Sequence, residues 1–348
     1  MVKGKKTACE LFSHLREGDP GLSEIKGLVY RENGDVKVNR PRQWLTSAEL
    51  DELPLPLYRD YYRSGPKAGM VSGNLPLAGK DSVYVMITGR GCPYKCAFCM
   101  QVLGHQVRRR SSEGIVDEME QAAGRYGAHT IYFADEIFLF NDEHTMRTME
   151  LIRRKGLHRR LRWRCCTRVN IINEKLLAAA RGSGCYSLEL GIESGNDAIL
   201  KEIGKNITVA QIRNAIQMIK KAGIRTEANY IIGHPGETES TIRQTISLAA
   251  NLNTDTAAIG LITPYPGTRI FEMALKGEGG YRLLDKNWSS FDKYGGRSME
   301  LDRIPLRKLR MYQRMGLVYF YVRNLRFIGL FRFISVNLRT ILHLLCAR

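Results

Sequence analysis

Short apolar runs alternate with amphipathic stretches along the middle of the chain, from about Val83 to Leu261. Runs rich in β-branched and aromatic residues predict strands, and apolar residues three or four positions apart predict helices. Each predicted strand is followed by a helix or by a loop that leads to one. We expect six strands, at residues 83–88, 130–134, 162–166, 187–191, 226–232 and 256–261. Repeated strand–helix units of this kind are typical of an α/β fold with a parallel sheet.

Hydroxyl side chains mark several of the predicted helix starts. Ser111 and Ser112 precede one apolar-periodic stretch, and Thr208 and Thr268 precede two others. Such residues cap helices because the side-chain oxygen accepts a free backbone N–H of the first turn. The pattern leaves two folds open, a partly closed barrel and a flat doubly wound sheet. In both folds ligands bind at the carboxyl ends of the strands.

The segments that flank this region have a different character. Before Val83 the chain is polar, and turn sequences such as GDP, ENGD and LPLP predict a small lobe followed by a linker. After Ile304 it carries Lys and Arg but neither Asp nor Glu. We therefore expect three parts: a lobe and linker over residues 1–78, a core barrel over 79–290, and a basic helical C-terminal extension over 291–348.

Composition narrows the class of protein. A chain of 348 residues with 44% hydrophobic residues can bury one barrel-sized core. No apolar run approaches the roughly 18 to 20 residues of a membrane span, and the N-terminus lacks the apolar stretch of a signal peptide. We therefore expect a cytoplasmic protein. The formal net charge of +18 favours an anionic partner, which could be nucleic acid, a lipid surface or a phosphorylated substrate.

Three of the eight cysteines lie close together, in the sequence GCPYKCAFC directly after the first predicted strand. Thiolates favour iron–sulfur clusters or zinc, and the short spacings of Cys92, Cys96 and Cys99 let one loop surround the metal. A structural zinc site normally needs four protein ligands. Three thiolates would leave one iron of a 4Fe-4S cluster open to a small molecule. The alternatives are a zinc site completed by His105 or a distant cysteine, and three unrelated thiols.

This CxxxCxxC motif, with the aromatic Phe98 before its last cysteine, resembles the radical S-adenosylmethionine (radical SAM) superfamily, and the resemblance spans roughly residues 53–288. It implies a partial (β/α)6 TIM-type barrel with one 4Fe-4S cluster that binds SAM through its open iron. It also implies reductive cleavage of SAM to methionine and a 5'-deoxyadenosyl radical. An electron donor of the flavodoxin or ferredoxin type and sensitivity to oxygen follow from that chemistry.

The resemblance also implies contacts to SAM at the ends of two strands. Asp135 and Glu136, in YFADEIF after the second strand, occupy the position that holds the methionyl amine. A carboxylate suits an ammonium group. Gly233, in YIIGHPGET after the fifth strand, lies in the glycine-bearing segment that passes under the adenine. The alternative for the acidic pair is a solvated loop or a helix cap.

Three further residues complete the implied SAM site. Glu193, at the end of the fourth strand, is the candidate contact to the ribose or amine of SAM. Lys205 and Arg168 are the candidate cations for its carboxylate. The alternative for each is a salt bridge at the rim of the barrel. No catalytic residue is assigned, because the sequence does not show which side chains line the barrel.

The motifs RGCPY, DE, GIESG, GHPGET and TPYPGT together are similar to the subgroup associated with B12-binding domains, which includes cyclases of porphyrin esters and methylases. Residues 21–56 look like the last strands of a cobalamin domain and its linker. The segment before Val83 is too short for the whole domain. The DxHxxG motif is also absent, since Phe12 and Glu17 stand where it needs Asp and Gly around His14. Cobalamin is therefore not expected, unless another chain supplies the domain or the reading frame is shortened.

The leading hypothesis is a radical SAM enzyme that methylates, cyclises or otherwise modifies a carbon of a hydrophobic or lipid-like substrate. One alternative is an accessory iron–sulfur protein whose cluster is structural or relays electrons. Another is a radical SAM enzyme acting on RNA, although no RNA-binding module is recognisable and nucleic acid is not favoured. The basic, aromatic tail over residues 306–345 predicts either helices that close the barrel or a helix at a membrane surface.

Overall fold

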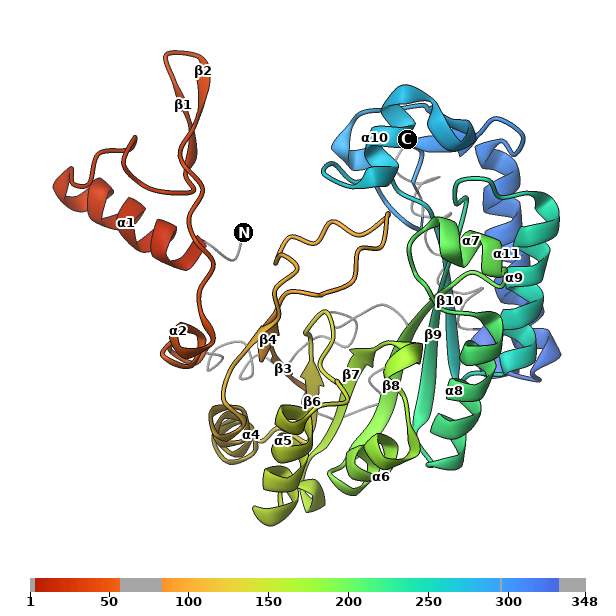
Figure 1. Ribbon diagram of the computed structural model, residues 1–348, viewed down its shortest axis with the longest axis horizontal. Helices are drawn as coiled ribbons and strands as arrows, with labels where there is room; N and C mark the ends of the chain where they lie inside the picture. Colours follow the sequence, from red (N-terminus) through yellow and green to blue (C-terminus); the bar gives the residue numbers. More distant parts are fainter. Residues whose placement is uncertain (1–3, 57–82, 295, 332–348) are drawn as a thin grey trace.

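A computed structural model describes residues 4–56, 83–294 and 296–331 of the chain (Figure 1). Its centre is a six-stranded parallel sheet in which the strands follow one another in chain order. The strands are β3 (Val83–Met86), β6 (Thr130–Phe133), β7 (Arg162–Thr167), β8 (Cys185–Glu193), β9 (Arg225–Ile232) and β10 (Thr256–Leu261). All six predicted strands are confirmed, with boundaries shifted by at most two residues. The α/β fold is that of a partial TIM-type barrel.

Helices connect the strands and lie along the outer side of the sheet (Figure 1). The predicted caps Ser111, Thr208 and Thr268 each accept a hydrogen bond from a backbone N–H of the first turn, which confirms the three helix starts. The helices are α4 (Ser112–Tyr126), α5 (Glu143–Arg154), α6 (Glu174–Gly182), α7 (Asp197–Glu202), α8 (Val209–Lys221), α9 (Glu239–Leu252), α10 (Arg269–Lys276) and α11 (Leu306–Arg323).

The two faces of the sheet differ in polarity because side chains alternate along each strand. On β7, Trp163 and Cys165 are fully buried in the apolar core between the sheet and the helices. Arg164 and Cys166 point to the opposite, interior face of the curved sheet. The two adjacent cysteines therefore differ, since Cys165 is buried in the core and Cys166 is half-buried.

Short elements complete the barrel. The antiparallel pairs are β4 (Gly89–Arg90) with β5 (Arg108–Arg109) and β11 (Tyr281–Leu283) with β12 (Met299–Leu301). Four single turns of 3₁₀ helix lie between the larger elements: η1 (Leu157–Arg159), η2 (Val169–Ile171), η3 (Glu278–Gly280) and η4 (Trp288–Ser290). Of these elements, β4 and β5 matter most for the site, because the three clustered cysteines lie between them.

The N-terminal lobe lies beside the open edge of the barrel near β4 (Figure 1). It contains α1 (Gly4–Glu17), the hairpin β1 (Val29–Glu32) with β2 (Asp35–Val38), and α2 (Ser47–Asp51). Arg108 joins the lobe to the barrel, because its guanidinium donates to the carbonyl oxygen of Leu45 and lies 4.9 Å from the ring centroid of Trp44. The division into residues 1–78, 79–290 and 291–348 stays a prediction, and residues 57–82 lie outside the described part.

The predicted C-terminal extension contributes α11, which packs against α9 and the edge strand β10. The Gln313 amide donates to the carbonyl oxygen of Ile259 on β10 at 2.9 Å. A Cβ at Gly316 would lie 2.8 Å from the side chain of Ile259, so glycine permits this close approach. Within the described residues no helix combines the length and the hydropathy needed to cross a bilayer. Residues 332–348 of the predicted tail lie outside the described part.

Candidate radical-chemistry site

The cysteine motif lies on a loop whose base is closed by β4 and β5. Gly89 pairs with Arg109 and Arg90 pairs with Arg108, so residues 91–107 form one excursion from this two-stranded ladder. Inside the loop the Cys92 amide donates to the carbonyl oxygen of Gly104 at 3.0 Å. The sequence between the strands therefore folds as a closed loop that presents Cys92, Cys96 and Cys99 from one short stretch.

The rest of the barrel holds the middle of this loop in place. The Ala97 amide donates to the carbonyl oxygen of Ile203 at 2.9 Å, and the Ala97 carbonyl accepts from the Ile270 amide at 3.2 Å. Ile203 directly follows α7, and Ile270 lies in the first turn of α10. The loop is thus fixed to two segments that lie far from it in the sequence.

The three thiols of the loop are accessible to different degrees. Cys92 and Cys96 are half-buried and Cys99 is exposed. Burial raises the pKa of Cys92 and of Cys99, and the nearby Glu136 carboxylate raises it further in both. Among the described residues no three Cys, His, Asp or Glu side chains converge closely enough to hold a single metal ion. A donor set of three spaced thiols on one loop suits a multi-iron cluster better than one ion.

Asp135 and Glu136 follow β6 together but have different surroundings. The buried Asp135 carboxylate accepts hydrogen bonds from the Thr88 amide and hydroxyl, each at 2.9 Å, and from the Gly89 amide. Burial raises its pKa to about 7, while these hydrogen bonds lower it. Asp135 therefore holds the end of β3 to the end of β6. Its hydrogen-bonding capacity is used inside the protein, which leaves little for a ligand.

Glu136 is the member of the pair with unused capacity. Its Oε2 atom is buried and has no hydrogen-bond partner among the described residues. Burial raises the pKa of Glu136, whereas a hydrogen bond from the Gly91 backbone and the charges of Arg108 and Arg90 lower it. A buried carboxylate oxygen without a partner is costly unless a donor binds to it. The site therefore offers one carboxylate oxygen, beside the cysteine loop, to an incoming donor.

Glu193 and Lys205 form a buried ion pair across the end of β8. Lys205 Nζ lies 2.8 Å from Glu193 Oε1, and the two side chains are 6% and 7% exposed. A β-bulge between Gly191 and Glu193 and a positive φ of 67° at Glu193 turn its side chain toward Lys205. Glycine at position 191 leaves room for the pair in this position, because a Cβ there would lie 2.8 Å from Lys205 Nζ. The pair uses one of the three ammonium protons of Lys205.

Arg168 connects this ion pair to the cysteine loop. Its Nη2 donates to the carbonyl oxygen of Lys205 at 2.6 Å, and its Nη1 lies 3.5 Å from Cys96 Sγ. The guanidinium also lies over the Tyr94 ring, 3.6 Å from its centroid. The structure thus places Arg168 at Cys96, in contact with the loop itself.

The segment after β9 contains Gly233 and the neighbouring His234. Gly233 has a φ of +95°, and a Cβ there would lie 2.7 Å from Ile262 Cγ2, so packing within the protein already requires glycine. His234 is fully buried, and neither ring nitrogen has a hydrogen-bond partner among the described residues. Its ring lies 5.9 Å from that of Phe98 in the cysteine loop. Burial lowers the pKa of His234 to about 3, so the imidazole is neutral.

The interior face of the sheet carries a buried ionic network deeper in the barrel. Arg164 on β7 lies 3.1 Å from Glu189 on β8 and 3.2 Å from Glu227 on β9. Ser187 donates to Glu227 at 2.6 Å, and Asn229 donates to Glu189 at 2.7 Å. The alternation of apolar and polar residues on these strands is the sequence signal for this network. The floor of the barrel is therefore polar.

The fold brings the candidate site residues together at the carboxyl ends of the strands. Arg168 directly contacts both Cys96 and Lys205, and Lys205 contacts Glu193. Glu136 acts electrostatically on Cys92 and Cys99. Asp135 and Gly233 lie at the same edge, but interactions within the protein already account for the position of each. The unpartnered Glu136 oxygen and His234 are the features that the sequence alone did not single out.

The chain is similar to several known proteins. Residues 86–249 match the family model described as the radical SAM superfamily. The chain is 33% identical over 327 residues to an uncharacterized methyltransferase, PH0819, of Pyrococcus horikoshii, covering 92% of this chain and 66% of the relative. It is 30% identical over 254 residues to an anaerobic magnesium-protoporphyrin IX monomethyl ester cyclase of Cereibacter sphaeroides, covering 72% of this chain and 39% of the relative.

A solved structure with the same fold is that of the radical S-adenosylmethionine methyltransferase TsrM from Kitasatospora setae, with cobalamin and a [4Fe-4S] cluster bound. The TM-score is 0.66 at 16% identity, over 91% of this chain and 66% of that chain. At this identity the likeness concerns the fold. The chain spans about two thirds or less of the length of the relatives described here.

Proposed function

Because the chain belongs to the radical SAM superfamily and resembles its B12-associated enzymes, we propose that it cleaves SAM at a 4Fe-4S cluster held by Cys92, Cys96 and Cys99. The proposed reaction is methylation or cyclisation at a carbon of the substrate; for methylation a second SAM has to supply the methyl group, because the cleaved SAM keeps its own on methionine. One observation carries the proposal: three thiols on a fixed loop lie beside a buried carboxylate oxygen, on Glu136, that lacks a donor. The thiols suit the 4Fe-4S cluster, and the free carboxylate oxygen suits the ammonium group of SAM.

In this proposal each side chain near the loop has a distinct task. The bound cluster and SAM supply an electron and a cleavable carbon–sulfur bond, which yield methionine and a 5'-deoxyadenosyl radical. Glu136 accepts a hydrogen bond from the methionyl ammonium group through its free Oε2. Lys205 retains two ammonium protons for the carboxylate of SAM while it stays paired with Glu193. Arg168 keeps Cys96 positioned through its contacts to the sulfur and to Tyr94.

Cobalamin does not fit the described part of the N-terminal lobe. Residues 4–56 contain a two-stranded antiparallel hairpin, and no parallel sheet lies within them. His14, the only histidine before β3 in the sequence, has its Nδ1 2.9 Å from the carbonyl oxygen of Pro20. No cobalamin-binding residue is therefore assigned in this chain, and no step is derived through that cofactor.

Glu136→Gln is the variant that tests the proposed amine contact. The purified wild type, reconstituted anaerobically with iron and sulfide and supplied with SAM and dithionite, is expected to form 5'-deoxyadenosine. We expect E136Q to bind SAM about tenfold more weakly, because a hydrogen bond between two charged groups becomes one with a neutral amide. Equilibrium binding of SAM to the reconstituted protein measures this effect.

The matched control is Asp135→Asn, in the neighbouring residue. Asp135 holds the backbone of Thr88 and Gly89, so D135N is expected to lower the unfolding midpoint. The affinity for SAM should stay close to that of the wild type. If the wild type with an intact cluster forms no 5'-deoxyadenosine, the enzymatic proposal fails and the accessory iron–sulfur protein is favoured. If E136Q binds SAM as tightly as the wild type, the amine contact lies elsewhere.

We further propose that α11 attaches the protein to an anionic membrane surface. Its inner face packs on α9 and β10, yet its outer face still carries exposed apolar side chains: Met311, Met315, Val318, Tyr319 and Val322. Leu325, Phe327, Ile328 and Phe331 extend this exposed set past the helix end. Arginines 307, 314 and 323 lie among them. Apolar side chains flanked by arginine match the boundary between acyl chains and anionic headgroups.

Flotation with phosphatidylserine vesicles tests this attachment. The full-length wild type is expected to float with the vesicles at low salt and less at high salt, because headgroup attraction is screened. The double variant Met315→Asp, Val322→Asp should stay at the bottom, while Lys175→Gln, which removes a charge on α6 remote from this face, should float like the wild type. If the wild type does not float, the proposal is overturned. If light scattering shows a wild-type dimer and a monomeric M315D/V322D variant, the exposed face of α11 instead binds a second copy of the chain.

A further inference from the structure

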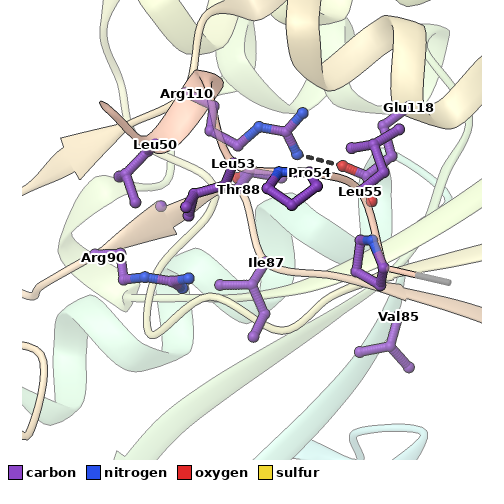
Figure 2. Close-up of a pocket in the computed structure, with 12 residues that line it drawn as sticks. Leu50, Leu53, Pro54, Leu55, Val85, Ile87, Thr88, Arg90, Arg110 and Glu118 are labelled. Carbon is purple, nitrogen blue, oxygen red and sulfur yellow. Dashed lines mark hydrogen bonds and ion pairs between the residues drawn. The ribbon is translucent and has the colours of Figure 1, made fainter. Parts of the chain in front are cut away.

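A cavity of about 230 Å³ lies between the linker after α2 and the edge strand β3. Figure 2 shows Val85, Ile87 and Arg90 on one side of it, with the linker residues Leu53 to Leu55 crossing opposite them. Arg110 and Glu118 lie on the far side of the linker. The proposed chemistry uses none of the side chains that line this cavity.

The walls of the cavity are mainly apolar. The linker contributes Leu53, Pro54, Leu55 and Pro56, α2 contributes Leu50, and β3 contributes Val85 and Ile87. Ile87 is 48% exposed although it immediately follows β3, whose four residues are buried or half-buried. An exposed apolar side chain at a concave surface gains free energy when a ligand covers it, at about 25 cal/mol per Å² removed from water. The cavity therefore favours a ligand with an apolar body.

One charged group that lines this cavity, Arg90, makes no side-chain hydrogen bond among the described residues, although the carboxylates of Asp135 and Glu136 act on its charge. Four arginines lie in β4, in β5 and directly after β5, and three of them have acceptors. Arg108 donates to the carbonyl oxygens of Leu45 and Leu103. Arg109 pairs with Asp142, and Arg110 pairs with Glu118. Arg90 alone has no hydrogen-bond acceptor among the described residues, and its Nε is buried. A guanidinium binds carboxylates and phosphates through paired N–H groups and is costly to bury without one.

We propose that this cavity binds the anionic end of the substrate, a carboxylate or phosphate joined to an apolar body. Arg90 pairs with the anion, and Leu53, Leu55 and Ile87 cover the apolar part. The assignment of this ligand as the substrate rests on the proposed radical SAM function. The sequence position supports it, because Arg90 is separated from Cys92 of the cysteine loop by Gly91 alone.

The neighbouring contacts explain how the cavity stays open beside that loop. Gly89 and Thr88 line it and are held by the Asp135 carboxylate, so the backbone before Arg90 is fixed. Arg110 is fixed by Glu118 and by Asp51 of α2. The two arginines therefore differ in role: Arg110 joins the lobe to the barrel, and Arg90 remains available to a ligand.

Binding of simple amphiphiles to the reconstituted full-length protein tests the proposal, with SAM present in excess. The probes are octanoate, octyl phosphate and octanol, measured by calorimetric titration. We expect one or both anions to bind at least tenfold more tightly than octanol, and Arg90→Gln to remove that advantage. Because Arg90 is partly exposed and its side chain makes no hydrogen bond among the described residues, R90Q should shift the unfolding midpoint only slightly. Preference for octanoate or octyl phosphate distinguishes a carboxylate from a phosphate substrate.

Two controls separate this site from others. Arg307→Gln removes an exposed charge from α11, where an amphiphile could adsorb to the apolar face. If R307Q weakens binding as much as R90Q, or if R90Q binds the anions like the wild type, the proposal is overturned. It is also overturned if octanoate binds only when SAM is left out of the titration, because the cavity would then belong to the SAM site. Formation of 5'-deoxyadenosine without added substrate tests the radical function separately. The proposed anion site can therefore fail while the radical function holds, and the radical function can fail while the anion site holds.

Discussion

Replacing any one of Cys92, Cys96 or Cys99 with alanine is expected to abolish both the cluster and the formation of 5'-deoxyadenosine. Each thiol is assigned to a different iron, so loss of one thiol leaves an iron without its protein ligand. Loss of an outer-shell partner typically costs 10- to 100-fold in metal affinity or activity, so loss of a direct ligand should exceed about a hundredfold. Iron and sulfide analysis together with product formation measure the effect.

Cys9→Ala and Cys166→Ala are the matched controls for these variants. Cys9 is exposed on α1 and Cys166 is half-buried on the interior face of β7, so each tests a thiol outside the loop. Both should retain the wild-type iron content. The three loop cysteines are half-buried or exposed, and their alanine variants should therefore keep the unfolding midpoint of the metal-free protein. A loop variant that keeps full iron content and activity would remove that cysteine from the ligand set.

The second large effect is expected at the buried ion pair. Lys205→Met leaves the Glu193 carboxylate buried without its cation, and removing one partner of a buried pair typically costs about 3–5 kcal/mol. Denaturant unfolding of the metal-free protein should show this loss directly. Because both side chains are less than a tenth exposed, solvent cannot replace the missing partner.

The double variant Glu193→Gln, Lys205→Met separates the ion pair from general packing damage. Removing both charges should recover most of the stability lost in K205M, since no buried charge then remains unpaired. SAM affinity should stay low in the double variant if Lys205 also contacts the SAM carboxylate. Equal stability of K205M and the wild type would show that the pair contributes little to the fold.

The strands and helix starts were predictable because they depend on local patterns. Alternating apolar residues fix β7, and the hydroxyls of Ser111, Thr208 and Thr268 fix the helices that follow them. The spacing of the cysteines likewise predicts a shared loop. These features need no knowledge of which distant segments meet, so the sequence alone was sufficient.

The different roles of Asp135 and Glu136 could not be predicted in the same way. Adjacent acidic residues look equivalent in sequence, and the backbone amides of Thr88 and Gly89, far away in the chain, decide which one is used internally. The free guanidinium of Arg90 has a similar origin. Four arginines lie in two short stretches, and only their tertiary partners distinguish them.

The attachment of the cysteine loop to Ile270 also bears on how the protein is made. Ala97 reaches its partner on α10 only after a further segment of about 170 residues has been synthesised. At roughly 5 to 20 residues per second, the ribosome needs on the order of ten to thirty seconds for that segment. The cysteine loop therefore gains this contact, and with it its final position against α10, only late in synthesis.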